Sequence, residues 1–192
     1  WGRRRRYGTP REEPTLYVLQ VRPAVVHDVA EDPRMQSLLP ERVFCKSTLA
    51  LGHGSYDDLR DIVYVRRDRF DPAQNPRIAG EVGKLDEALA AQERRYVLLG
   101  PGRWGSSDSS LGVPVQWSQI SSAASIGYLT VPPGATRSKP IDGSFVDWDW
   151  LDSMPALKET EHLRWVRLER PMDAFVNGRE GLGLIARPAE SA

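Results

Sequence analysis

The chain has 192 residues, and its 26 Lys and Arg residues are balanced by 26 Asp and Glu residues, so its formal net charge at pH 7 is zero. This length suits one ordinary domain with a sizeable core, and the charge balance excludes an overall field that would attract nucleic acid or a membrane surface. The single cysteine, Cys45, excludes an internal disulfide, and no apolar run approaches the roughly 18 residues of a spanning helix, so we expect a cytoplasmic protein without membrane partners.

The N-terminal segment predicts a strand after an irregular lead-in. Residues 1–14 include four consecutive arginines, and without interleaved aromatic residues these favour a solvated terminus over a nucleic-acid site. The apolar, β-branched run 16–22 ends at Pro23, which is typical of a strand buried on at least one face. Gln20 and Arg22 would share one face of this strand, either as ligand contacts or as an ordinary exposed face, and their spacing alone favours the exposed face.

The next part of the chain predicts a linker and two strands. Charged residues and prolines dominate residues 24–40, which predicts a linker with at most one short helical turn and the first domain boundary. Residues 43–47 and 61–65 are runs typical of strands, and the glycines on either side of His53 predict a loop that joins them.

The clearest pattern predicts a helix, a strand and a glycine loop in direct succession. Apolar residues recur at three- and four-residue steps within residues 75–94, which is typical of an amphipathic helix. Residues 96–99 predict a short buried strand. Residues 100–108, Gly-Pro-Gly-Arg-Trp-Gly-Ser-Ser-Asp, follow as a loop.

This glycine loop has two interpretations. Gly100 and Gly102 would let backbone amides approach an anion, and Arg103 supplies a planar donor fork suited to phosphate or carboxylate. The loop lacks the Lys-Ser/Thr pair of a Walker loop. The alternative is a structural turn in which Arg103 pairs with an acid and Trp104 fills the core, and composition alone favours this alternative.

The remaining sequence predicts further strands and one short helix. Residues 113–115 and 126–131 are typical of strands, and the Pro- and Gly-containing residues 132–143 predict a loop. Asp147 is placed to cap a helix that starts there. The tryptophans that alternate with the aspartates of this segment favour a helix anchored by its aromatic residues over a cation site.

A terminal β-hairpin is predicted after residues 163–169, where apolar and charged side chains interleave. Residues 172–176 and 182–186 would form its two strands. Asn177 and Gly178 between them supply the positive backbone angles of a tight turn.

The sequence gives little support to metal binding or nucleophilic catalysis. His27, His53 and His162 do not have metal-ligand spacing with one another or with Cys45. His53 could act as a base or a phosphate donor, but its flanking glycines favour a turn residue. The serines of residues 106–110 have no neighbouring histidine, so a nucleophile elbow is not supported.

The order of these segments resembles proteins of the phosphoenolpyruvate synthase and pyruvate, phosphate dikinase family. Residues 16–23, Leu-Tyr-Val-Leu-Gln-Val-Arg-Pro, look like the closing strand of that family's ATP-grasp domain, with its Leu-Gln-x-Arg-Pro motif. Residues 61–65, 96–108 and 111–117 resemble the C-terminal extension of a bacterial subgroup. The resemblance covers most of residues 15–188.

This resemblance implies a division of the chain into three parts. Residues 1–26 would be the end of the ATP-grasp nucleotide-binding domain, residues 27–42 a linker, and residues 43–188 a C-terminal α/β extension domain. The implied fold class is α/β (α+β), a mixed β-sheet with few helices and a C-terminal β-hairpin, in a fragment of a larger ATP-grasp-containing protein.

The resemblance also implies an activity and its ligands. Gln20 and Arg22 would contact ATP and its Mg²⁺, and Arg22 would be catalytic by stabilising the charge of the moving phosphoryl group. The partners would be ATP, a phosphoryl acceptor such as pyruvate, and an upstream ATP-grasp segment of the same protein.

The chain also departs from the family's pattern. The ATP-grasp body would lie upstream of Trp1, no Thr-Ser-His phosphohistidine segment is present, and the stretch 124–127 is shorter than in the family. We therefore expect an isolated chain that is catalytically incomplete. The alternative function is a non-catalytic phosphate- or carboxylate-binding module built on Gly100, Gly102 and Arg103, or a scaffold that docks domains.

Overall fold

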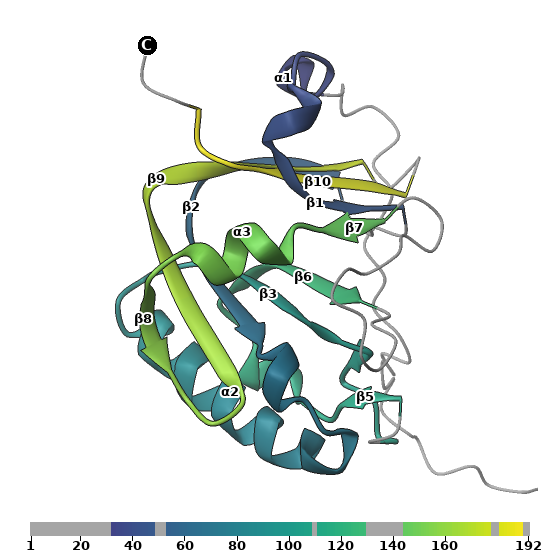
Figure 1. The fold of residues 1–192 in the computed structure, drawn as a ribbon, viewed down its shortest axis with the longest axis vertical. Helices are drawn as coiled ribbons and strands as arrows, with labels where there is room; N and C mark the ends of the chain where they lie inside the picture. The colour runs from purple at the N-terminus through teal and green to yellow at the C-terminus, as the bar shows by residue number, and fades with distance from the viewer. Residues whose placement is uncertain (1–31, 49–52, 109–110, 130–143, 178–180, 190–192) are drawn as a thin grey trace, which may run out of the picture.

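A curled, mixed β-sheet with few helices forms the fold, in agreement with the predicted class (Figure 1). The structure is a computed structural model and describes residues 32–48, 53–108, 111–129, 144–177 and 181–189. The eight strands of this sheet are β1 (Val43–Ser47), β2 (His53–Val65), β3 (Tyr96–Pro101), β6 (Ala123–Leu129), β7 (Phe145–Val146), β8 (Ala156–Glu159), β9 (Leu163–Asn177) and β10 (Leu182–Ala186). Their order is β6-β3-β2-β9-β10-β1-β7, and β8 pairs with β9.

The helices are short except for one, and a small second sheet lies beside the main one. The α-helices are α1 (Pro33–Gln36), α2 (Asn75–Ala90) and α3 (Trp148–Ser153), and the 3-10 helices are η1 (Pro40–Arg42), η2 (Arg67–Arg69), η3 (Pro72–Gln74) and η4 (Trp117–Gln119). The second sheet pairs β4 (Arg103–Trp104) with β5 (Gly112–Val113) in parallel. None of the helices in the described ranges is long and apolar enough to cross a membrane.

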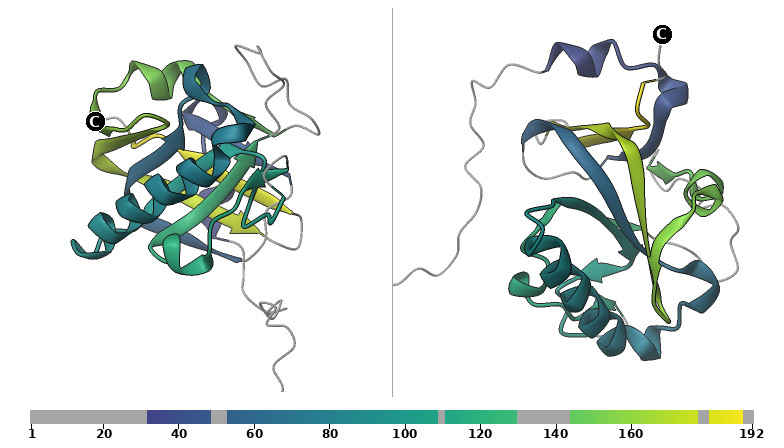
Figure 2. Two further views of the ribbon diagram at one scale, coloured as in Figure 1. Left: turned by 90° about the horizontal axis from the view of Figure 1, so that it is seen from below. Right: turned by 90° about the vertical axis from the view of Figure 1, so that its left-hand side faces the viewer.

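Helix α2 forms where the apolar periodicity predicts it and connects two parallel strands. Ile78, Val82, Leu85 and Leu89 are buried along one side of the helix, which lies along one face of the sheet (Figure 2). The helix ends at Ala90, four residues before the predicted end, and Glu93 then takes a positive φ of 53°. This turn lets the chain enter β3 parallel to β2.

Alternating side chains of the central strands separate the core into two clusters, because successive residues of a strand point to opposite faces. Ile62 and Tyr64 of β2 belong to the cluster beneath α3, which includes Trp148. Val63 and Val65 belong to the cluster beneath α2. The sheet is therefore covered on both faces in its central part.

Strand β2 corrects the prediction that residues 43–47 and 61–65 are strands joined by a glycine loop. The strand already begins at His53, so residues 53–60 are extended rather than part of a turn. Strands β1 and β2 are not neighbours, because β9 and β10 lie between them. The antiparallel pairing with β9 supplies the backbone partners of residues 53–60, whose own sequence is too polar to indicate a strand.

The C-terminal half confirms the predicted hairpin and the capped helix. Strand β10 pairs antiparallel with β9, from Leu182 opposite Asn177. The predicted turn role of Asn177 is wrong, because Asn177 is the last residue of β9 and does not take a positive φ, and Gly178 lies outside the described residues. Residues 163–169 and 172–176 form one strand of 15 residues, β9, with irregular pairing to β2 near its middle. Asp147 caps α3, since its carboxylate accepts a hydrogen bond of 3.1 Å from the amide of Trp150. The predicted strand 113–115 is shorter than expected, because β5 ends at Val113 before Pro114.

Several predicted features lie outside the described residues: Gln20 and Arg22 with their strand, His27, and the loop at residues 132–143. The linker was predicted to hold at most one short helical turn, but its described part holds two short helices, α1 and η1. Strand β1 starts at Val43, where the C-terminal domain was expected to begin.

Candidate functional site

The glycine loop lies at the carboxyl edge of the parallel strands β2, β3 and β6. Residues 100–108 start in the last residues of β3, and η2 follows the end of β2 at the same edge. In open α/β sheets this edge is where ligands commonly bind, because loops from neighbouring strands converge there. A ligand at this edge would contact the main-chain amides of the loop and the side chain of Arg103.

The glycines of the loop are required by the packing of the chain on itself. A Cβ atom added to Gly100 would collide with the indole ring of Trp104. Gly102 has a φ of +69°, and an added Cβ would lie 2.7 Å from the carbonyl oxygen of Leu111. Both positions therefore favour glycine whether or not an anion binds nearby.

Two of the loop's amides are already used within the chain. The amide of Arg103 donates to the carbonyl of Leu111 at 2.9 Å, and the amide of Gly105 donates to the carbonyl of Val113 at 2.8 Å. These bonds belong to the β4–β5 pairing. They hold the main chain of the loop in place, and they leave these two amides unavailable to an anion.

The Arg103 side chain is exposed and uncommitted. No hydrogen bond, ion pair or ring contact joins its guanidinium to another residue of the described ranges. Trp104, in contrast, is partly buried against the core beneath α2, and its Nε1 donates to the carbonyl of Gly127 at 3.1 Å. The interpretation of the loop as a structural turn is therefore confirmed for Trp104, which packs against the core. It is not confirmed for Arg103, because no acid of the described residues pairs with it.

The loop is braced against the start of α2. The Asn75 amide donates from Nδ2 to the carbonyl of Gly112 at 3.0 Å, and Gly112 lies directly opposite Arg103 in the β4–β5 pairing. The first turn of α2 contains no acidic residue. The positive end of this helix dipole is therefore not neutralised by its own first turn, which favours negative charge in this neighbourhood.

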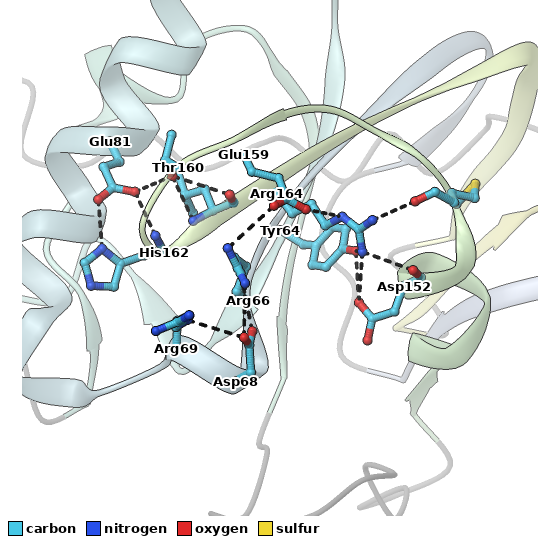
Figure 3. Close-up of polar contacts among 12 residues, drawn as sticks. Tyr64, Arg66, Asp68, Arg69, Glu81, Asp152, Glu159, Thr160, His162 and Arg164 are labelled. Atoms are coloured by element: carbon cyan, nitrogen blue, oxygen red, sulfur yellow. Dashed lines mark hydrogen bonds and ion pairs between the residues drawn. The ribbon is translucent and has the colours of Figure 1, made fainter.

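Other arginines at this edge already hold carboxylates of the chain (Figure 3). Arg66 of the β2–η2 junction lies 3.1 Å from Asp68 and 3.7 Å from Glu159. The hydrogen bond from Arg66 lowers the pKa of Asp68. Arg67 pairs with Asp152 of α3 at 2.6 Å. These guanidinium groups are engaged in connecting η2 to α3 and β8, unlike that of Arg103.

Tyr64 and Arg164 extend this polar network toward the core (Figure 3). The Tyr64 hydroxyl donates to Asp152 at 3.0 Å, and Arg164 lies 3.0 Å from Glu159. Burial, together with the neighbouring Asp152 carboxylate, raises the pKa of Tyr64 above its usual range. The network therefore has a structural explanation, because it joins β2, α3 and the β8–β9 hairpin.

Two aspartates of the α3 segment, for which a cation site was considered as an alternative, are engaged by arginines of the chain. Asp147 caps the helix and forms an ion pair with Arg187, while Asp152 pairs with Arg67. Trp148 is buried in the core beneath the helix. The interpretation as a helix anchored by its aromatic residues is confirmed.

Sequence reasoning missed two buried carboxylates. Asp61 accepts hydrogen bonds from Arg94 Nε at 2.9 Å and Trp165 Nε1 at 2.8 Å. Asp86 accepts from the Tyr96 hydroxyl at 3.0 Å. One signal was present, because Asp86 follows the buried Val82 by four residues and therefore falls on the apolar side of α2.

Cys45 is buried, and burial raises the pKa of its thiol to about 12. Because the thiolate is the reactive form, we expect no reaction with Ellman's reagent at pH 8 while the chain is folded. In denaturant the thiol should react stoichiometrically. Rapid labelling of the folded chain would contradict the buried position of β1.

Comparisons with protein-family models, with curated proteins and with solved structures each gave no match.

Proposed function

We propose that this chain is the C-terminal region of an ATP-dependent phosphotransferase of the phosphoenolpyruvate synthase type, and that its described domain holds an anionic group through Arg103. The order of motifs supports the first part. Residues 19–23 read Leu-Gln-Val-Arg-Pro, and the segments 61–65, 96–108 and 111–117 follow in the order of the family's C-terminal extension.

The guanidinium of Arg103, which is exposed and has no partner among the described residues, is the observation that carries the second part. Its main chain is held by the β4–β5 pairing, so the side chain starts from a defined position. An arginine without an internal acid partner can donate two parallel hydrogen bonds to a phosphate or a carboxylate. Arg66 and Arg67 at the same edge are occupied by acids of the chain.

Gln20 and Arg22 have a different role in this proposal. They would contact ATP and Mg²⁺ from the closing strand of the ATP-grasp domain, with Arg22 as the catalytic group and a small acid such as pyruvate as the acceptor. These two assignments come from the motif alone. An upstream ATP-grasp segment would be needed to complete the site, so the isolated chain should produce no phosphoenolpyruvate from ATP, magnesium and pyruvate.

The experiment is a calorimetric titration of the purified chain with inorganic phosphate and, separately, with ATP and magnesium. We expect Arg103→Ala to weaken phosphate binding by about 10- to 100-fold, because a hydrogen bond to a charged group contributes about 1.5–3 kcal/mol. Arg103→Lys should recover only part of the affinity, since an ammonium group cannot form the bidentate contact.

Arg95→Ala is the matched control, because Arg95 is also exposed but precedes β3, at the opposite edge of the sheet. It should bind phosphate like the unaltered chain. If Arg103→Ala also binds phosphate like the unaltered chain, or the unaltered chain binds none, the role of Arg103 is wrong.

The exposed Arg103 also favours a second function, a non-catalytic module that binds phosphate or carboxylate by itself. The two proposals differ in ATP binding. If Gln20→Ala and Arg22→Ala lose ATP, the phosphotransferase proposal is supported. If they keep ATP and only Arg103→Ala loses its ligands, the module is supported, and failure of every titration would favour a docking scaffold.

A further inference from the structure

A buried histidine connects helix α2 to the turn between β8 and β9 (Figure 3). His162 is 2% exposed, and its Nδ1 lies 2.8 Å from Oε1 of Glu81 on α2. Glu161, the preceding residue, adds a second carboxylate. One side-chain donor atom from each of these three residues lies within 4.8 Å of the other two.

Glu81 is held in a defined orientation toward the histidine. Its Oε2 accepts hydrogen bonds from the Thr160 hydroxyl at 2.5 Å and from the His162 amide at 3.2 Å. Burial alone would raise the pKa of Glu81, but the hydrogen bonds from Thr160 and His162 outweigh it and lower the pKa. With Oε2 occupied, Oε1 faces the imidazole.

Glu161 differs from Glu81 in its exposure. Its side chain is 60% exposed, and its carboxylate lies 3.5 Å from Arg77 on the first turn of α2. An exposed ion pair of this length contributes little stability, so the Glu161 carboxylate can turn toward another cation at little cost. The cluster thus combines two fixed donors with one adaptable donor at the surface.

We propose that Glu81, Glu161 and His162 bind a divalent transition-metal ion, and that zinc suits this set of donors. One imidazole nitrogen and two carboxylate oxygens are ligands that zinc accepts, with a fourth position left for water. The ion takes the place of the hydrogen-bonded proton between His162 Nδ1 and Glu81 Oε1, and the neutral ring carries its proton on Nε2 instead.

The surroundings provide the outer support that metal ligands commonly have. Thr160 and the His162 amide hydrogen-bond to the second oxygen of Glu81, and such contacts fix the orientation of a ligating carboxylate. Donors that share a tetrahedral zinc ion lie about 3.4 Å apart, since zinc–ligand distances are near 2.1 Å. The Glu81–His162 contact of 2.8 Å therefore needs only a small opening to admit the ion.

The test titrates zinc into the purified, EDTA-treated chain and measures binding by competition with a chromophoric chelator and by the shift of the thermal unfolding midpoint. We expect one ion per chain and a higher midpoint, because a ligand that binds only the folded state stabilises it. Glu161→Gln should weaken zinc binding at least tenfold without lowering the midpoint of the metal-free chain, since Glu161 is exposed.

Two further variants make the result decisive. His162→Gln should abolish the zinc-dependent shift, although it can also lower the stability of the metal-free chain because His162 is buried. Glu87→Gln, an exposed glutamate on the same helix, is the matched control and should bind zinc normally. Zinc affinity that is unchanged in Glu161→Gln, or a chain whose midpoint zinc does not raise, would show that the cluster is only a hydrogen-bonded link between α2 and β9.

Discussion

Replacing Asp61 with alanine is expected to lower the free energy of unfolding by about 4 kcal/mol, because breaking a buried ion pair leaves a charge without compensation. Asp61 is 2% exposed and forms an ion pair with Arg94, whose side chain is 18% exposed. It also accepts the hydrogen bond of Trp165 Nε1. The variant would leave a guanidinium and an indole N–H in the core without their acceptor.

Urea denaturation measures this effect, with the midpoint and the slope reported together. Asp57→Ala is a matched control in the same strand. The side chain of Asp57 is 71% exposed, and its carboxylate lies 3.6 Å from the guanidinium of Arg34. Loss of such an exposed pair should change stability by less than about 1 kcal/mol. If the two variants are equally stable, Asp61 is not the buried anchor that joins β2 to β3 and β9.

Replacing Gly112 with alanine is expected to lower the free energy of unfolding by about 3 kcal/mol, at the upper end of typical overpacking effects. An added Cβ would overlap the carbonyl oxygen of Arg103, a backbone atom that cannot turn away like a side chain. The β4–β5 pairing must then open. Because this pairing positions Arg103, the variant should also lose phosphate affinity to a similar degree as Arg103→Ala.

Gly80→Ala provides a control of opposite sign for this prediction. Gly80 lies on the exposed side of α2, and an added Cβ would meet nothing within 4 Å. Alanine there should stabilise the chain by about 0.5–1 kcal/mol, because glycine loses more conformational freedom in a helix. If Gly112→Ala unfolds at the same denaturant concentration as the unaltered chain, the close contact between Gly112 and Arg103 is not present in solution.

Local sequence patterns predicted the position of the candidate site but not whether its glycine loop binds a ligand. Glycine spacing and the position of Arg103 singled out the segment at the end of a buried strand, because both features are local, but Gly100 and Pro101 belong to β3, and Arg103 and Trp104 form β4. The same spacing did not distinguish a ligand loop from a tightly packed one. That distinction depends on Leu111 and Gly112, which pair with the loop after a separate stretch of chain.

The sequence by itself determined the elements whose signals lie within one segment: α2 through its apolar period, α3 through the Asp147 cap, and the strands β9 and β10 through their apolar runs. Only the tertiary structure decided the strand order and the buried clusters. The reason is physical, because a buried charge is defined by partners that fold next to it. The hydrogen-bond donors to Asp61 are 33 and 104 residues away, at Arg94 and Trp165, and Arg167 lies 3.6 Å from its carboxylate, so no local pattern connects these residues.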